Sequence, residues 1–163
     1  MEKFAINVKI KRLSETAKIP TKAHESDAAF DIYADIQDTF VPFGKSIDES
    51  EKGIKVMPGQ TVKVHTGFST EIPVGYWGAV YARSGLATKQ GLRPANCVAV
   101  IDAEYRGEWL IPLHNDSSDV QIIHHGDRIA QFMLAPVIET KFEEVSELSN
   151  SDRGEGGFGS SGK

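Results

Sequence analysis

The sequence predicts an all-β fold, a barrel or sandwich of short strands with one short helix. Apolar and polar residues alternate with a period of two over several short stretches, and turns that contain Gly and Pro separate these stretches. No stretch keeps the 3.6-residue periodicity of a long amphipathic helix. A chain of 163 residues is long enough for one domain with an adequate core.

The strands are expected in order along the chain. They cover residues 4–11, 26–34, 61–70, 76–82, 98–101, 109–113, 120–123, 128–134 and 141–145. The one predicted helix spans 84–90, with Ser84 as its cap and Gly91 at its end.

Three parts differ in character along the chain. Residues 1–148 are predicted to form the barrel domain. Within it, residues 37–53 lack periodicity and are rich in charge, which indicates a surface insert. Residues 149–163 are Gly-rich, with Phe158 as their only large apolar side chain, and are predicted to form a flexible tail.

Composition limits the partners of the protein. The chain has 23 acidic and 18 basic residues, a net charge of −5, which argues against a dedicated nucleic-acid or membrane-surface binder. An anionic ligand would need local Arg side chains, backbone N–H groups or a metal. The single cysteine excludes an internal disulfide. No apolar run approaches the ~20 residues of a membrane span, and the charged start is unlike a secretory signal. We therefore expect a cytoplasmic protein.

The apolar runs 98–101 and 109–113 flank a polar turn that Gly107 closes, which is the pattern of a β-hairpin. Asp102 stands where the first strand gives way to the turn, so its carboxylate is held and still meets solvent. This placement suits a general base that orients a water. Taken alone, Asp102 also fits a residue that only starts a turn.

Three further segments suit phosphate. Arg83-Ser84-Gly85 stands at the start of the short helix, 126–131 enters a strand through a tight turn, and 153–162 places an Arg and a Phe on a Gly-rich backbone. Arg side chains and helix-start N–H groups bind phosphate well. Taken one by one, these segments also fit a helix cap, an ordinary turn and a linker.

Five motifs in this order resemble the homotrimeric dUTP diphosphatases (dUTPases). They are residues 27–34 (DAAFDIYA), 83–87 (RSGLA), 101–107 (IDAEYRG), 126–131 (GDRIAQ) and 153–162 (RGEGGFGSSG). The resemblance implies a jelly-roll-like β-barrel whose tail closes over the active site. It implies Mg²⁺-dependent hydrolysis of dUTP to dUMP and pyrophosphate by water attack at the α-phosphorus. This reaction limits uracil incorporation into DNA and supplies dUMP for dTMP synthesis. It also implies a homotrimer with shared active sites.

The resemblance assigns roles residue by residue. Asp102 resembles the base that orients the attacking water, and Tyr105 the ring that packs on deoxyribose and excludes a 2′-hydroxyl. Asp31 matches the acid that reaches Mg²⁺ through water. The other implied substrate-binding residues are Asn96, Val98 and Ala99 at the uracil edge, Arg83, Ser84, Gly85 and Gln131 at the phosphates, Phe158 over uracil, and Arg153, Gly159, Ser160 and Ser161 in the tail.

The chain departs from the family pattern at a few positions. The family usually has Gly at Ala29 and Ala99, Pro at Ala82 and Thr at Ser161. Ala99 matters most, because it would strain a backbone that needs positive φ and is harmless otherwise. The 37–53 insert is longer than the usual connection, and its length fits a rim cover, an extra trimer contact or a protein partner.

Two alternatives compete with the dUTPase interpretation. One is a dCTP deaminase of related fold, which the release of ammonia from dCTP would reveal. The other is a nucleotide-gated regulatory module that signals through residues 37–53, a role that could coexist with catalysis.

Ser84 is better interpreted as a phosphate donor than as a nucleophile, because no His stands in a motif beside it.

Overall fold

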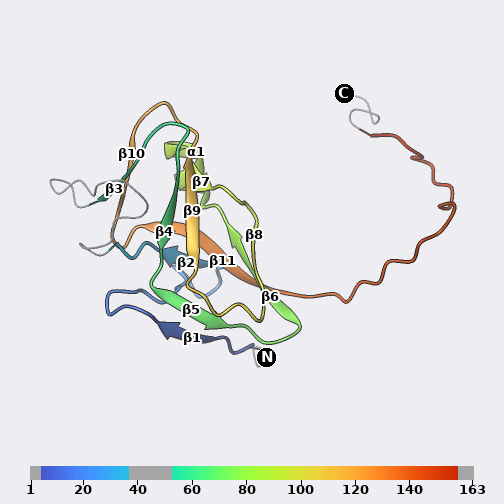
Figure 1. The fold of residues 1–163 in the computed structure, drawn as a ribbon, viewed down its shortest axis with the longest axis horizontal. Helices are drawn as coiled ribbons and strands as arrows, with labels where there is room; N and C mark the ends of the chain where they lie inside the picture. Colours follow the sequence, from blue (N-terminus) through green and yellow to red (C-terminus); the bar gives the residue numbers. More distant parts are fainter. Residues whose placement is uncertain (1–4, 37–52, 158–163) are drawn as a thin grey trace.

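The computed structural model describes residues 5–36 and 53–157, and in this part of the chain short strands surround one apolar core (Figure 1). The order is β1 (Lys9–Arg12), β2 (Phe30–Tyr33), β3 (Gly53–Val56), β4 (Thr61–His65), β5 (Phe68–Glu71), β6 (Tyr76–Tyr81), α1 (Ser84–Gln90), β7 (Leu92–Pro94), β8 (Ala99–Ile101), β9 (Leu110–Asn115), β10 (Gln121–His124) and β11 (Arg128–Pro136).

The strands form four small sheets. The largest has the order β2-β11-β6-β8, a second has the order β4-β9-β7, and β1-β5 and β3-β10 pair separately. All of these pairings are antiparallel. The mostly β architecture with one short helix confirms the predicted fold class. No helix of the described residues is long and apolar enough to cross a membrane.

An aromatic cluster lies at the centre of the core. The Trp109 ring is 5.3 Å from Phe68 and 5.2 Å from Phe132, edge-on to the latter, and only 1% of the Trp109 surface is exposed. Its indole Nε1 donates to Thr70 Oγ1 at 3.1 Å, which satisfies the polar atom that burial would otherwise leave unpaired. Because Phe68 belongs to β5 and Phe132 to β11, this one side chain joins two sheets.

The predicted hairpin around Asp102 is wrong. β8 pairs with β6, whereas β9 pairs with β4 and β7, so the two apolar runs belong to different sheets. The physical reason is the burial of Trp109, which draws the start of the second run into the core between the sheets. The residues between β8 and β9 therefore connect two sheets, and Asp102 still follows a strand directly, as predicted.

The predicted strand 61–70 is two strands that diverge at a corner. β4 pairs with β9 and β5 pairs with β1. Gly67, between them, has φ +69°, and a Cβ there would overlap the Asp35 carboxylate, so the corner requires glycine. At the far end of β5, Lys9 donates to Glu71 at 2.8 Å, and this hydrogen bond lowers the pKa of the Glu71 carboxyl.

Other local predictions differ from the structure. The sequence does not predict strands β3 and β7: β3 begins at the last residue of the predicted insert, and β7 has only three residues and ends at a proline. Residues 141–145 are not a strand, since no neighbouring strand pairs with them. Arg83, with an extended backbone, is the N-cap of α1, and Ser84 is the first helical residue. Gly91, in the left-handed region at φ 66°, ends the helix as predicted.

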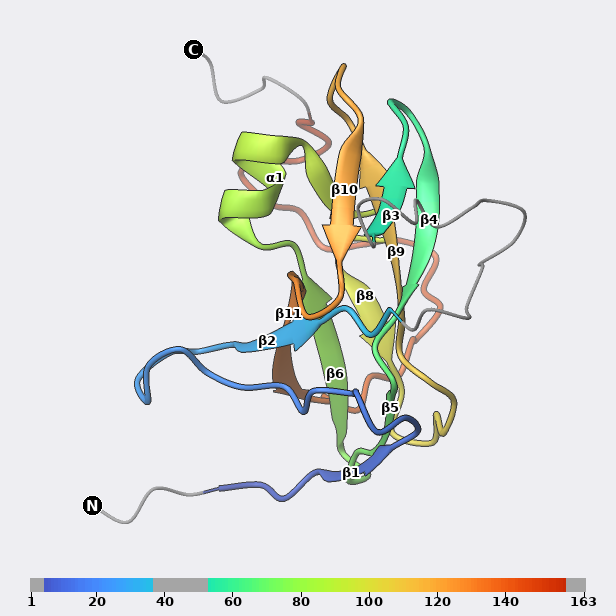
Figure 2. The same ribbon diagram turned by 90° about the vertical axis from the view of Figure 1, so that its left-hand side faces the viewer.

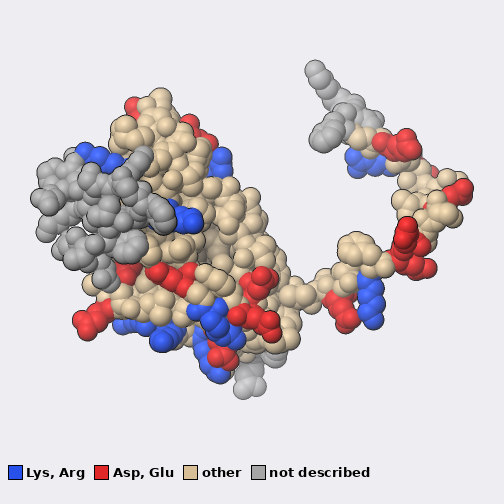
Figure 3. All heavy atoms as spheres, in the orientation of Figure 1, with Lys and Arg blue, Asp and Glu red and all other residues tan. Residues whose placement is uncertain are grey.

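After β11 the chain leaves the barrel as an extended arm. Residues 137–157 contain no strand or helix. The Val137 N–H still donates to the Gly75 carbonyl at 2.8 Å, and the chain after it leads away from the body (Figure 3). Phe142 is 99% exposed on this arm. The predicted insert lies outside the described residues except for Gly53, which begins β3.

Candidate active site

A buried carboxylate between two arginines forms the first part of the site. Asp31 lies on β2 and is 5% exposed. Its Oδ1 accepts from Arg83 Nε at 3.0 Å and its Oδ2 from Arg128 Nη1 at 3.2 Å. Arg83 Nη1 also donates to the Arg128 carbonyl at 3.2 Å. Two guanidinium groups against one carboxylate leave a net positive charge, which suits an anionic ligand.

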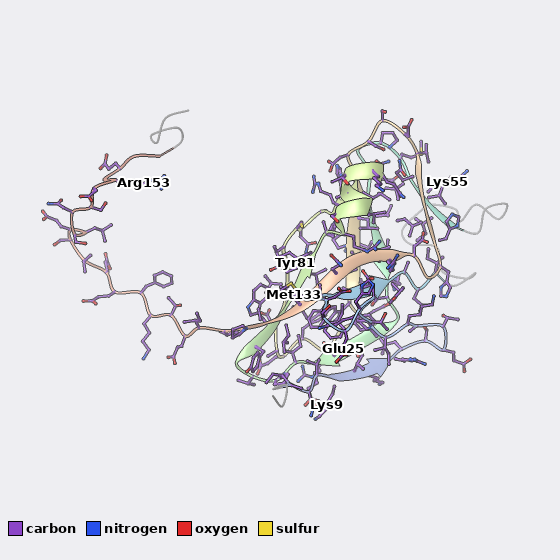
Figure 4. All side chains as sticks on the ribbon, turned by 180° about the vertical axis from the view of Figure 1, so that it is seen from behind. Lys9, Glu25, Lys55, Tyr81, Met133 and Arg153 are labelled. Atoms are coloured by element: carbon purple, nitrogen blue, oxygen red, sulfur yellow. The ribbon has the colours of Figure 1, made fainter. Side chains whose placement is uncertain are left out.

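Gln131 lies beside this group. It is on β11, and its register pairs it with Asp31 on one side and Tyr81 on the other. Residues directly opposite each other on neighbouring strands share a face of the sheet. Figure 4 shows β6 and β11 side by side at Tyr81 and Met133. Ser84, exposed, follows Arg83 at the start of α1.

The structure therefore brings together the acid predicted to reach Mg²⁺ through water and several residues predicted to contact phosphate, from three segments far apart in the sequence. They are Asp31, Arg83, Ser84, Gly85 and Gln131. A cavity of about 220 Å³ adjoins them, where α1 lies beside β10 (Figure 2). Its lining residues are Arg83, Leu86, Gln90, Leu92, Ile122, Ile123, Asp127, Arg128 and Ile129. We call the group of Asp31, Arg83, Arg128 and Gln131 the arginine cluster.

The turn that carries Asp102 forms the second part of the site. Asp102 is exposed, and its carbonyl accepts from the Tyr105 N–H at 3.1 Å. The Tyr105 hydroxyl donates to the Glu108 carbonyl at 2.9 Å. The ring lies across Gly107, because a Cβ at that position would come within 2.6 Å of Tyr105 Cζ. Tyr105 as a whole remains 43% exposed, so part of the residue is open to a ligand.

The residues before this turn follow the same edge. Asn96 and Val98 are exposed, and Ala99 is buried in β8 opposite Val80. A strand residue has negative φ. Alanine is therefore compatible with this backbone, and the departure from glycine at position 99 causes no strain.

The two parts of the site are far apart within one chain. β2 and β8 are the two edges of one sheet, with β11 and β6 between them. Asp31 lies opposite Gln131 on β11, and Gln131 lies opposite Tyr81 on β6. At the other edge of the sheet, Ile101, the residue before Asp102, pairs with Gly78 on β6. At ordinary strand spacing and rise, Asp31 and Asp102 are separated by about 14 Å perpendicular to the strands and ~13 Å parallel to them. The combined separation along the sheet is roughly 20 Å.

The described residues of the tail, 149–157, join neither part. Arg153 lies on the arm, away from the barrel (Figure 4), and its Nε donates to the Gly156 carbonyl at 2.8 Å. Phe158, Gly159, Ser160 and Ser161 lie outside the described residues.

The described residues offer little to a metal ion by themselves. Within residues 5–36 and 53–157, no group of three His, Cys, Asp or Glu side chains could hold a metal. Each oxygen of Asp31 already accepts one hydrogen bond from an arginine. This fits contact with Mg²⁺ through water, since Mg²⁺ keeps several waters and binds through few carboxylates together with substrate phosphates.

Two residues of the site received no role from the sequence. Arg128 stands within the predicted 126–131 motif, but its ion pair with Asp31 depends on the pairing of β11 with β2. Glu108 holds the end of the Asp102 turn through contacts with the β4–β5 corner. Local sequence gives no signal for either contact. Asp31 is 97 residues away from Arg128, and the corner residues are 41 or more residues away from Glu108.

Together, the small β-barrel and the net positive charge of its arginine cluster are typical of a protein for a phosphate-bearing ligand. The chain belongs to the dUTPase family, whose family model matches residues 49–162. The deoxyuridine 5′-triphosphate nucleotidohydrolase of Desulfotalea psychrophila is 40% identical over 93% of this chain and 91% of its own length. The corresponding protein of Desulfitobacterium hafniense is 38% identical over 99% of both chains.

Solved structures agree with the fold. The Staphylococcus bacteriophage 80alpha dUTPase, solved with dUPNHPP, superimposes with a TM-score of 0.76 at 26% identity and covers 98% of this chain and 100% of its own. That protein is one of the phage dUTPases described as controlling transfer of virulence genes. The dUTPase of phage phi11 of S. aureus, described as having a species-specific insert, shares the fold at 22% identity and a TM-score of 0.69, over 90% of this chain and 100% of its own.

Proposed function

We propose that this dUTP diphosphatase, which hydrolyses dUTP to dUMP and pyrophosphate, builds each active site from more than one copy of the chain. One copy supplies the Asp102 turn and another supplies the arginine cluster. The observation that carries this proposal is the separation of roughly 20 Å along the sheet between Asp31 and Asp102. One triphosphate with its attacking water needs both groups close together, and a homotrimer would supply them.

In this site Asp102 is the general base. Its carboxylate, exposed at the end of β8, orients a water and takes its proton as the water attacks the α-phosphorus. Phosphoryl chemistry depends on positioning and on charge stabilisation, with little covalent work for the protein. Arg83 and Arg128 supply that charge, and Ser84, Gly85 and Gln131 hold the phosphate oxygens. When bound, Mg²⁺ neutralises phosphate charge, and Asp31 would hold its water shell.

The uracil base and the deoxyribose are recognised at the edge of β8. Asn96 and the backbone of residues 97–100, which includes Val98 and Ala99, pair with the uracil edge. A close fit there rejects the thymine methyl by overlap and cytosine by mismatched donors. Tyr105 packs its exposed ring face on deoxyribose, where a 2′-hydroxyl would clash.

The arm after β11 also supports an oligomer. Five of its large apolar side chains are at least half exposed: Val137, Ile138, Phe142, Val145 and Leu148. Exposed apolar side chains this close together are typical of a segment that is buried against another chain. Residues 149–163, which follow, would then reach a neighbouring site, with Arg153, Gly159, Ser160 and Ser161 at the phosphates and Phe158 over uracil.

A panel of nucleotides tests the activity and its selectivity. With Mg²⁺ present, pyrophosphate release is expected from dUTP and far less from UTP, dCTP and dTTP. Removal of Mg²⁺ by a chelator should stop the release. Ammonia from dCTP would instead indicate the deaminase. Equal hydrolysis of UTP and dUTP would contradict the site described above.

Tyr105→Ala is expected to narrow the preference for dUTP over UTP by about 10- to 100-fold, because it opens space beside C2′ of the sugar. The measurement is kcat/KM for both nucleotides with the same enzyme preparation, so that a loss of folded protein cancels in the ratio. An unchanged ratio would remove Tyr105 from sugar recognition.

A regulatory interaction through residues 37–53 is a second candidate function. The charged, aperiodic sequence of this segment and the regulatory role stated for the bacteriophage 80alpha dUTPase favour it. The test is a pull-down from the cells of origin that compares intact protein with a version shortened at 37–53. A partner retained only by the intact protein supports the role, and identical captures argue against it.

A further inference from the structure

We propose that Glu108 is a positioning residue for sugar selectivity, because its side chain fixes the end of the turn that carries Tyr105. This inference rests on the proposed role of Tyr105 at the deoxyribose. Glu108 would act without touching the nucleotide, through the backbone that holds the tyrosine ring.

Both oxygens of the Glu108 carboxylate accept hydrogen bonds from the corner between β4 and β5. Its Oε1 accepts from the N–H groups of Thr66 at 3.2 Å and Gly67 at 2.8 Å. Its Oε2 accepts from His65 Nδ1 at 2.7 Å. Hydrogen bonds to an ionised carboxylate are stronger than those between neutral groups. The Glu108 side chain is also partly buried, where water competes less for these hydrogen bonds.

The corner itself is a rigid anchor. Thr66, which is fully buried, donates its hydroxyl to the Trp109 carbonyl at 2.7 Å, and the Trp109 N–H donates to the Phe68 carbonyl at 3.1 Å. Side-chain and backbone contacts therefore join residues 108–109 to the corner, and the buried Trp109 joins both to the core. The end of the turn is held at one place in the barrel.

Tyr105 is fixed through that end of the turn. Its hydroxyl donates to the Glu108 carbonyl at 2.9 Å, so the tip of the ring is attached to the residue whose side chain is clamped. The rest of the turn, residues 104–107, is exposed. An exposed segment with few buried contacts moves easily unless its ends are held. Release of Glu108 should therefore let the tyrosine ring take several positions.

Asp102 depends much less on this clamp. It follows β8 directly, and β8 is held by its pairing with β6. Loss of the Glu108 side chain should therefore reduce the discrimination between dUTP and UTP more than it reduces turnover of dUTP. A purely structural residue would lower activity toward both nucleotides in the same proportion.

The test measures kcat and KM for dUTP and UTP with the full chain. Glu108→Ala is expected to lower the dUTP/UTP ratio of kcat/KM about tenfold, with a smaller loss in kcat for dUTP. Glu108→Gln should restore most of the ratio, because its amide oxygen accepts the same two N–H groups. Glu104→Ala, which removes an exposed acid from the same turn, is the matched control and should leave the ratio unchanged.

Glu108→Asp provides a milder variant if the alanine variant folds poorly, since it withdraws the carboxylate from the corner by one methylene. It should give an intermediate ratio. A proportional loss toward both nucleotides in Glu108→Ala and Glu108→Asp would overturn the proposal. Tyr105→Ala separates the positioning role of Glu108 from the sugar-binding role of Tyr105. If it lowers the ratio and the Glu108 variants do not, only the positioning role fails; if it leaves the ratio unchanged, the sugar-binding role of Tyr105 fails.

Discussion

Asp102→Asn is expected to lower the turnover of dUTP by about 10²–10⁴-fold while the nucleotide still binds. Asparagine keeps the shape of the side chain but loses the basic oxygen that takes a proton from the attacking water. Asp102 is exposed just beyond β8, so the substitution disturbs no buried contact in the described residues. The folded protein and its affinity for dUTP should therefore change little.

The measurement pairs initial rates of pyrophosphate release with a binding titration that uses a non-hydrolysable dUTP analogue. Glu104→Gln makes the same chemical change at an exposed acid two residues away and should keep nearly full turnover. Near-normal turnover by folded Asp102→Asn protein would show that another group is the base.

Two inactive variants are expected to restore activity to each other when they are produced together. The first is Asp102→Asn with an intact tail, and the second is a chain that ends at Ser151 and keeps Asp102. If the tail closes over a neighbouring chain, a mixed oligomer contains sites in which a tail from the first variant covers an Asp102 from the second. The arm leads away from the barrel and from its own arginine cluster, which favours this arrangement (Figure 1).

The effect is large because neither variant alone has a complete site. Closure of the tail orders a Gly-rich segment, and the entropy lost must be offset by contacts from Arg153 and the serines to phosphate. Activity in the mixture should rise well above the sum of the separate variants. Mass measurement establishes that mixed oligomers exist, and a double variant with both changes is the control. Confirmed mixed oligomers with no recovered activity would mean that the tail does not act between chains.

Much of this protein follows from local sequence. Alternating apolar residues predicted most of the strands, and Gly91 predicted the end of the helix. The five motifs identified the family and the acid, Asp102, that follows a strand. These features are local because a strand's two faces, a turn's φ angles and a motif's spacing are properties of neighbouring residues.

Strand pairing and ion pairing were decided only by the tertiary structure. The apolar runs on either side of Asp102 look like a hairpin, yet burial of Trp109 places them in different sheets. Arg128 meets Asp31 only because β11 pairs with β2, and Glu108 meets Gly67 only because the core brings the corner to the turn. Such contacts depend on how the whole core is packed. The local sequence around each of these residues does not indicate which distant residue it will contact.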